Sequence, residues 1–308
     1  MFDMKKFLPI FIVILFAGAS QVNAQQLPLY SQYMLNDFFY NPAIAGSKEY
    51  SPILLSIHKQ WIGIKETPST QTLSGHTMLS NNNVGLGAVI FHDSFGPESH
   101  LGLQAIYSYH FHIDRLNKIS LGLAAVAEQY KMDQRFLTLT VYDDPAITYM
   151  IEKTIVPDAI FGAYAYGKKY YAGITGSHLF QSKLKINKNV EENKMVRHYF
   201  VMGGYKFDFQ NSPQFEIEPS ILMKTTEVTT PQFDINLKFY YDKNYWFGMS
   251  LRPGDSFVAS IGFKHDQYFF GYAYDFTFSD LSSYTYGSQE IVFGMNIGEN
   301  TRRSRSFF

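Results

Sequence analysis

Apolar and polar side chains alternate with a period of two along most of this chain. Residues 101–114, LGLQAIYSYHFHID, show the pattern most clearly: the odd-numbered positions are apolar or aromatic, and most even-numbered positions are polar or small. The alternation recurs in residues 268–278 and 291–298. Successive side chains of a β-strand point to opposite faces, so this pattern predicts strands with one apolar and one polar face.

Segments of this kind follow one another from residue 52 almost to the end of the chain. The predicted strands are residues 52–61, 70–79, 83–92, 100–113, 118–131, 157–166, 169–177, 197–209, 214–225, 231–241, 244–252, 255–265, 267–278 and 288–298. Many reach about ten residues, enough to cross a bilayer at a tilt, whereas strands of soluble proteins are usually about five or six residues long. A soluble sandwich would have to bury several large aromatics from every strand in one core. The pattern therefore predicts an all-β fold, a transmembrane antiparallel β-barrel of about 14 strands.

The connections between these strands alternate in length. Short turns rich in Asn, Asp, Gly and Lys come between longer connections, among which are residues 93–99, 132–156 and 178–196. Outer-membrane barrels have short periplasmic turns and longer outer loops. We therefore expect both ends of the barrel chain on the periplasmic side and the long connections outside.

Composition supports a membrane barrel over a soluble protein. Aromatic residues make up 17% of the chain, as much as the charged residues. Membrane barrels carry girdles of aromatics at both interfaces, which explains such a fraction. The formal net charge of −1 gives no indication of a nucleic-acid partner. Because the chain has no Cys, we expect neither disulfides nor a lipoprotein anchor.

The first 24 residues have the pattern of a signal peptide. Lys5 and Lys6 precede an apolar run at 7–19, and small residues end at Ala24. The run is shorter than the roughly 20 residues that a spanning helix needs. We expect cleavage before Gln25 and export of the mature chain.

An irregular aromatic stretch, LYSQYMLNDFFYNPAIAGS (29–47), precedes the first predicted strand. A 14-stranded barrel has a lumen wider than its wall side chains fill, so this stretch suits a plug folded into the lumen. The alternative is a periplasmic strap, packed under the barrel or docked on a partner. The predicted plug residues are Tyr30, Tyr33, Phe38, Phe39, Tyr40, Asn41 and Pro42. The expected organisation is 1–24 signal peptide, 25–50 plug or strap, 51–298 outer-membrane barrel and 299–308 basic periplasmic tail.

Several stretches resemble the PorP/SprF family of Bacteroidetes outer-membrane proteins. They are SQYMLNDFFYNPAIAGS (31–47), HKQWIGIKETPSTQTLSGH (58–76), VGLGAVIFHDSFGP (84–97) and GYAYDFTFSDLSSYTYGSQEI (271–291), in which Gln289 replaces an expected His. The resemblance implies a non-enzymatic component of the type IX secretion system and gliding motility machinery in a Gram-negative outer membrane. It also implies partners: a secreted adhesin with a type B C-terminal domain, exported or anchored at the surface, and periplasmic ring components. The alternative function is a passive channel or transporter for small hydrophobic molecules.

Few side chains are arranged for chemistry. His110 and His112 lie two apart on one predicted strand face, a spacing that can hold a metal, but no third ligand is signalled. Glu216 and Glu218 are a possible acid–base pair, which a polar barrel interior explains equally well. Trp246 is expected in an interfacial belt. We therefore expect no catalytic, metal or cofactor site.

The two longest connections carry apolar residues that suggest contact with a partner. They are Phe136, Leu137, Leu139, Tyr142, Tyr149, Leu179 and Phe180. Clusters of apolar side chains on water-exposed loops often mark interfaces. The alternative is that these residues pack on each other as a lid over the barrel mouth.

Overall fold

The structure is a computed structural model that describes residues 31, 33–79, 83–136, 150–184, 186 and 194–298. The expected signal peptide (1–24) and basic tail (299–308) lie outside these residues. Within the described part, no helix is both long and apolar enough to cross a membrane.

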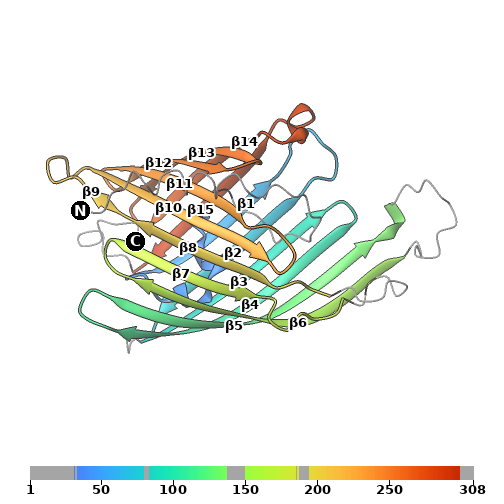
Figure 1. Ribbon diagram of the computed structural model, residues 1–308, viewed down its shortest axis with the longest axis horizontal. Helices are drawn as coiled ribbons and strands as arrows, with labels where there is room; N and C mark the ends of the chain where they lie inside the picture. Colours follow the sequence, from blue (N-terminus) through green and yellow to red (C-terminus); the bar gives the residue numbers. More distant parts are fainter. Residues whose placement is uncertain are drawn as a thin grey trace, which may run out of the picture.

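Fourteen antiparallel strands close into a barrel (Figure 1). They are β1 (Ser51–Lys59), β2 (Ser69–Met78), β3 (Val84–Phe95), β4 (Glu98–His112), β5 (Lys118–Asp133), β6 (Ile151–Tyr166), β7 (Tyr170–Ser177), β8 (His198–Tyr205), β10 (Phe215–Thr226), β11 (Gln232–Tyr241), β12 (Tyr245–Arg252), β13 (Ser256–His265), β14 (Tyr268–Thr277) and β15 (Ser288–Ile297). The two-residue strand β9 (Phe207–Asp208) continues β8 and pairs with β10. Pairing of β1 with β15, from Ser51↔Ile297 to Lys59↔Gln289, closes the ring. The predicted fold class and strand number are confirmed.

The outward face of the barrel wall is largely apolar, and most polar side chains of the strands face inward. On β4, Leu101 and Leu103 are 48% and 51% exposed, whereas Gln104 and His110 are 4% and 1% exposed. A soluble protein would bury the leucines and expose the polar residues. The inverted distribution is that of a barrel whose outer surface contacts lipid.

Most strand boundaries differ from the prediction by a few residues, and two of these differences change a connection. The long connection expected at 93–99 is wrong: β3 runs to Phe95, β4 starts at Glu98, and only Gly96 and Pro97 form the turn. Strand β6 begins six residues earlier than the predicted residue 157. The first ladder continues through the polar residues Asp93, Ser94 and Ser99, and the second through the mixed sequence IEKTIV (151–156). Backbone pairing does not require a continuous apolar face. The ends of β5 and β6 project at the right of Figure 1, where β6 extends past β7.

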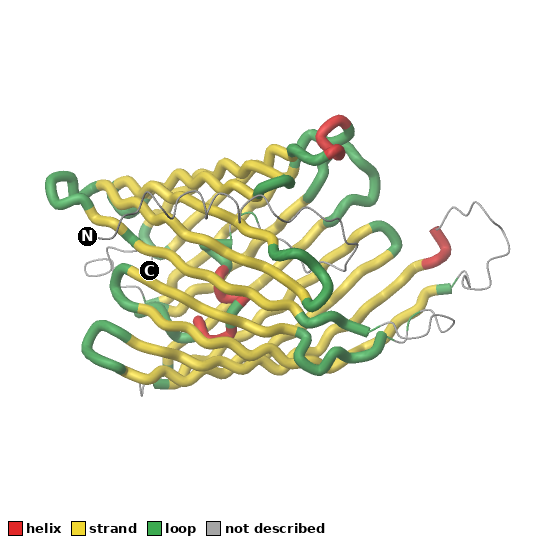
Figure 2. The backbone as a smooth tube through the Cα atoms, viewed as in Figure 1, coloured by secondary structure: helices red, strands yellow, loops and turns green. Residues whose placement is uncertain are grey.

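The longest connections lie at one rim of the barrel, although that rim also has short turns. The long-loop rim carries residues 60–68, 96–97, 134–150, 178–197, 227–231, 253–255 and 278–287. The short-turn rim carries 79–83, 113–117, 167–169, 209–214, 242–244 and 266–267. Strand β1 starts and β15 ends at the short-turn rim. The short helices η3 (Gln134–Phe136) and η4 (Asp280–Ser283) belong to the long-loop rim, whereas α2 (Asp37–Tyr40) and η2 (Pro42–Ile44) lie inside the ring of strands (Figure 2).

Candidate functional site: a plugged lumen

Residues 33–46, called the plug below, occupy the lumen of the barrel. All of them except the half-buried Leu35 are buried, and their apolar side chains form one cluster with wall residues such as Val89, Phe91 and Phe200. The structure therefore places Tyr33, Phe38, Phe39, Tyr40, Asn41 and Pro42 inside the barrel. Tyr30 lies outside the described residues.

The Asn41-Pro42 step starts a tight turn at the centre of the plug. The side chain of Asn41 accepts a hydrogen bond from the Ala43 N–H at 2.9 Å and caps η2, with Pro42 at its first position. The Asn41 amide also donates to the carbonyl of Ala163 on β6 at 3.1 Å. One side chain thus both shapes the plug and ties it to the wall.

Glycines of the wall make room for the plug. A Cβ on any of them would collide with a plug atom at less than 3.0 Å. We call this set the glycine seat: Gly85, Gly87, Gly122, Gly162 and Gly173. At Gly122 the obstructing atoms belong to the backbone of Pro42 and Ala43, which cannot swing aside as a flexible side chain could. The chain leaves the plug at Gly46, whose φ of +74° favours glycine.

Polar wall residues bind the backbone of the plug. The hydroxyls of Ser120 and Ser108 donate to the carbonyls of Ala43 and Ala45, each at 2.6 Å. The His76 Nδ1 accepts from the Gly46 N–H at 3.1 Å. Buried carbonyls and amides require hydrogen-bond partners. The wall therefore replaces the hydrogen bonds that the plug backbone would otherwise form with water.

His110 is part of this attachment. Its Nε2 lies 2.7 Å from the Ala45 carbonyl, which can only accept, so Nε2 carries the proton and Nδ1 accepts from the Tyr166 hydroxyl at 2.8 Å. His112 lies at the end of β4, on the same strand face as His110, and is exposed. Among the described residues, no group of three or more His, Cys, Asp or Glu side chains could hold a metal ion.

Several charged side chains of the lumen wall form ion pairs. Asp234 lies 2.9 Å from the Lys224 ammonium and 2.8 Å from the Arg252 guanidinium. Glu216 lies between Lys206 and Lys243, at 3.4 and 3.3 Å. Burial of charge is tolerable only with such partners.

Glu218 accepts a hydrogen bond from the Tyr240 hydroxyl at 2.9 Å. Both glutamates of the candidate acid–base pair, Glu216 and Glu218, therefore bind side chains of the wall itself.

The position of Trp246 differs from the interfacial belt that we expected. Its side chain is only 3% exposed and faces the lumen, where the Lys238 ammonium lies 5.6 Å from the ring. The indole fills the space over Gly262, the residue opposite it on β13. Parity along β12 could have revealed this, because Tyr245 and Phe247 face outward and therefore turn Trp246 inward.

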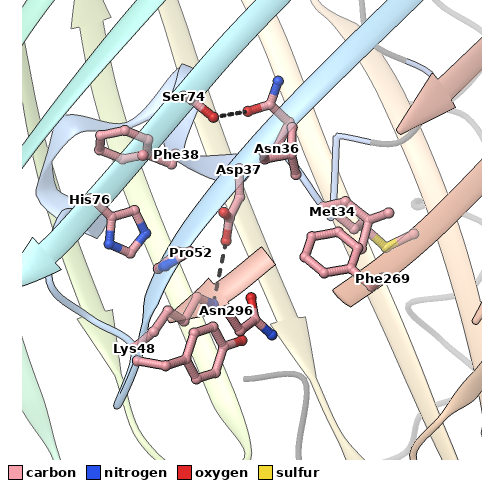
Figure 3. A pocket seen from close by; sticks show the side chains of 14 residues that line it. Met34, Asn36, Asp37, Phe38, Lys48, Pro52, Ser74, His76, Phe269 and Asn296 are labelled. Atoms are coloured by element: carbon pink, nitrogen blue, oxygen red, sulfur yellow. Dashed lines mark hydrogen bonds and ion pairs between the residues drawn. The ribbon is translucent and has the colours of Figure 1, made fainter. Parts of the chain in front are cut away.

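Small pockets lie beside the plug. One of about 50 Å³ lies between the plug and the wall, beside Phe38, Ser74 and Asn296 (Figure 3). In this pocket the Lys48 ammonium lies 3.8 Å from the Asp37 carboxylate. Burial lowers the pKa of Lys48, and Asp37 opposes that shift. A second pocket, of about 20 Å³, lies beside Phe39 and Phe91.

The connection 178–197 folds partly into the barrel mouth. Lys183 forms a bridge with Lys194, and Leu184 and Met195 pack against Val156 and Tyr130.

The candidate partner residues are only partly described. Leu179 is half-buried and Phe180 is 65% exposed, whereas Phe136 is located by its backbone in η3 alone. Leu137, Leu139, Tyr142 and Tyr149 lie outside the described residues. The described residues therefore test neither a contact of these seven residues with a partner nor a lid formed by them.

The inverted surface, the closed ring and the filled lumen define an integral β-barrel of the outer membrane that carries its own plug. The family described as "Type IX secretion system membrane protein PorP/SprF" matches residues 22–295, and the chain belongs to it.

Comparison with solved structures finds other outer-membrane barrels at low identity. A FadL homologue of Pseudomonas aeruginosa has a TM-score of 0.46 and 9% identity, over 83% of this chain and 91% of that one. The CymD monoaromatic hydrocarbon channel has a TM-score of 0.47 and 11% identity, over 89% and 94%. The KdgM porin has a TM-score of 0.38 and 10% identity, over 80% and 99%. A comparison with curated proteins finds no similar sequence.

Proposed function

We propose that this barrel is a non-enzymatic component of the type IX secretion system that holds or hands over a secreted adhesin at the cell surface. The adhesin would carry a type B C-terminal domain and serve gliding motility. The observation that supports this proposal is the plug, which fills the lumen and is hydrogen-bonded to the wall at Asn41, Ala43, Ala45 and Gly46. A barrel filled in this way is suited to contact proteins at its rims.

The alternative function, passage of small hydrophobic molecules, fits the interior less well. Sites for small molecules usually have volumes of about 300–1,000 Å³. The two pockets beside the plug, about 50 and 20 Å³, have room for water but not for such a ligand. A pocket of about 580 Å³ lies at the short-turn rim beside Asp208, Glu216 and Tyr240, so this limit on size applies to the space beside the plug alone. Passage through the lumen would require the plug to leave its seat and lose its hydrogen bonds.

Surface retention of an adhesin tests the proposal directly. The probe is a reporter protein fused to the type B C-terminal domain of an adhesin from the same organism, detected on intact cells. Deleting this barrel should release the reporter into the medium or leave it inside the cell, and plasmid-borne wild type should restore retention. Unchanged retention in the deletion strain would contradict the proposal.

Shortening the connections at 137–149 and 187–193 then tests the long-loop rim. Retention should fall while the barrel stays folded, as judged by heat-modifiable gel mobility. If retention survives in a folded barrel, the adhesin contacts another surface.

Conductance in planar bilayers tests the alternative. The wild-type barrel should show no sustained channel, with a purified porin as the positive control. Steady open-channel steps from wild-type protein would favour the passive channel.

A further inference from the structure

The connection between β14 and β15, residues 278–287, exposes several large aromatic side chains. We call it the aromatic loop. Phe278 is 62% exposed, Tyr284 75% and Tyr286 77%. Asp280 is the one charged residue of this loop. The loop projects from the end of β14 at the top right of Figure 1. Exposed aromatics gathered on one loop mark contact with a partner or with a membrane.

The aromatic loop is fixed to the connection between β1 and β2. The Tyr286 N–H donates to the Ile62 carbonyl at 2.7 Å, and the Ile62 N–H donates to the Gly287 carbonyl at 2.8 Å. The Thr285 hydroxyl donates to the same Ile62 carbonyl at 3.1 Å. A Cβ on Gly63 would lie 2.9 Å from the Tyr286 ring, so this ring packs over a glycine and yet stays exposed. The aromatics are therefore held outward on a backbone with defined hydrogen bonds.

A side chain of β14 shows on which side of the wall the loop lies. Ala273 and Asp275 are 0% and 4% exposed and face the lumen, so Tyr274 and Phe276 share the outward face of the strand. The Tyr274 hydroxyl donates to the Tyr286 carbonyl. The backbone of the aromatic loop therefore lies at the outer face of the wall and not over the lumen.

The lipid-facing surface of β14 continues into this loop. On β1 the outward apolar series ends at Lys59, and on β15 it is preceded by Gln289. On β14 no polar residue ends the outward series, which continues beyond the strand to Phe278. The series comprises Tyr268, Phe270, Tyr272, Tyr274, Phe276 and Phe278. The aromatic loop is thus continuous with the surface that contacts lipid.

The chemistry of the loop suits the boundary between acyl chains and headgroups. Tyrosine combines an apolar ring with a hydroxyl that needs a polar partner, and it is enriched at membrane–water interfaces for that reason. Tyrosines are also common in protein interfaces. The position of the loop favours lipid, because an adhesin approaches from beyond the rim, whereas Tyr274 holds this loop against the outer face of the wall.

We propose that the aromatic loop lies in the interfacial region of the bilayer at the long-loop rim, with Phe278, Tyr284 and Tyr286 in contact with lipid. The loop then belongs to the membrane-contacting surface of the barrel, although it is one of the long-loop connections. This inference is independent of the proposed function, and it leaves contact with an adhesin to the other connections of that rim.

The depth of a spin label in lipid vesicles tests the position of the loop. The natural chain has no Cys, so Tyr284→Cys carries a single label. Asp280→Cys is the control on the same loop, because a charged residue is expected to face water. Leu103→Cys marks the acyl interior. The probe is the folded barrel in phosphatidylcholine vesicles, with folding checked by heat-modifiable gel mobility.

Collision rates with dissolved oxygen and with a water-soluble nickel chelate report the depth. Oxygen concentrates among acyl chains and the chelate in water, so the ratio of the two rates should be at least about threefold larger at position 284 than at 280. The ratio at 103 should be larger still. If the label at 284 meets the chelate as often as the label at 280 does, the loop stands in water and the inference is overturned.

Two further outcomes would identify a different occupant. Spin–spin broadening at position 284 that disappears on dilution with unlabelled barrel would place a second copy of this chain on the loop. The double variant Tyr284→Ser, Tyr286→Ser keeps the backbone bonds of the loop and should retain the adhesin reporter as wild type does. Loss of retention by the folded double variant would make the loop a protein contact. Either result overturns the inference.

The depth measurement distinguishes failure of this inference from failure of the proposed function. It uses only the barrel and lipid, so it places the loop whether or not deletion of the barrel alters retention of the reporter. A label at 284 in the interface, together with unchanged retention in the deletion strain, would support the inference and contradict the proposed function.

Discussion

At the scale of single residues, the glycine seat and the lumen-wall charges determine what the barrel can hold. Gly122 and Gly162 lie against the backbone and side chain of Asn41, Pro42 and Ala43. Glycine is usually unfavourable in a strand, because it has no side chain to pack and loses more conformational entropy on folding than other residues do. Its presence here is explained by the close approach of the plug.

Gly122→Ala should loosen the plug. The added methyl group would lie within 3.0 Å of plug backbone, and overpacking of this kind costs about 1–3 kcal/mol. We expect the strands to remain assembled and the plug to become accessible, measured as new conductance in planar bilayers. The control is Gly203→Ala on β8, where the nearest atom to the new Cβ lies 3.5 Å away. Equal conductance of the two variants would contradict a tightly seated plug.

Asp234 is the shared partner of Lys224 and Arg252, and its loss should destabilise the wall. Asp234→Asn removes the negative charge that the buried Lys224 and Arg252 share. Breaking a buried ion pair lowers the free energy of unfolding by about 3–5 kcal/mol. The measurement is the urea midpoint of unfolding, followed by gel mobility. As a control, Asp208→Asn breaks the Lys169–Asp208 pair, whose side chains are about half exposed, and should lower the midpoint much less, because solvent screens exposed ion pairs. Similar midpoints for both variants would show that the lumen wall is well hydrated.

At the scale of elements, strand parity and plug attachment behave differently. The alternation within a strand determines which of its faces is apolar, so the outward face of β4 could be predicted from its own sequence. The plug cannot be predicted in this way. Its helices α2 and η2 have four and three residues, far below the length at which helices are stable alone. Its conformation depends on the wall that binds its backbone.

Arginine scanning along one face of β4 tests the contact with lipid. Leu103→Arg, near the middle of the strand, should cost roughly 2–4 kcal/mol, whereas an interfacial position costs about 0–1 kcal/mol. Ile113→Arg is the matched interfacial variant, since Ile113 is 62% exposed just beyond the same strand. The measurement is the free energy of folding into lipid vesicles. If both arginines cost the same, this face does not cross the apolar interior of a bilayer.

At the scale of the whole molecule, the difference between the rims predicts its orientation. The long-loop rim should face outward, and the short-turn rim should face the periplasm. On intact cells, Lys153→Cys should react with an impermeant thiol reagent, while Lys168→Cys and Lys243→Cys should react only after the cells are opened. The natural chain has no Cys, so wild type supplies the blank. Labelling with the opposite pattern would reverse the orientation and remove the long-loop rim from contact with a surface adhesin.

The sequence by itself determined the features that depend on neighbouring residues. Alternation defined the strands and their outward faces, and short local motifs indicated the family that the match over residues 22–295 shows. These features were predictable because a strand presents its side chains with a period of two wherever it lies in the fold.

Only the tertiary structure decided how the interior is filled. The sequence allowed residues 29–47 to be a plug or a strap. It did not reveal that Gly122 lies against Pro42 or that β6 extends beyond β7. Those facts depend on which strands become neighbours when the barrel closes. They concern contacts between residues that are distant along the chain. Closure brings wall glycines and plug carbonyls together, and no local pattern encodes these contacts.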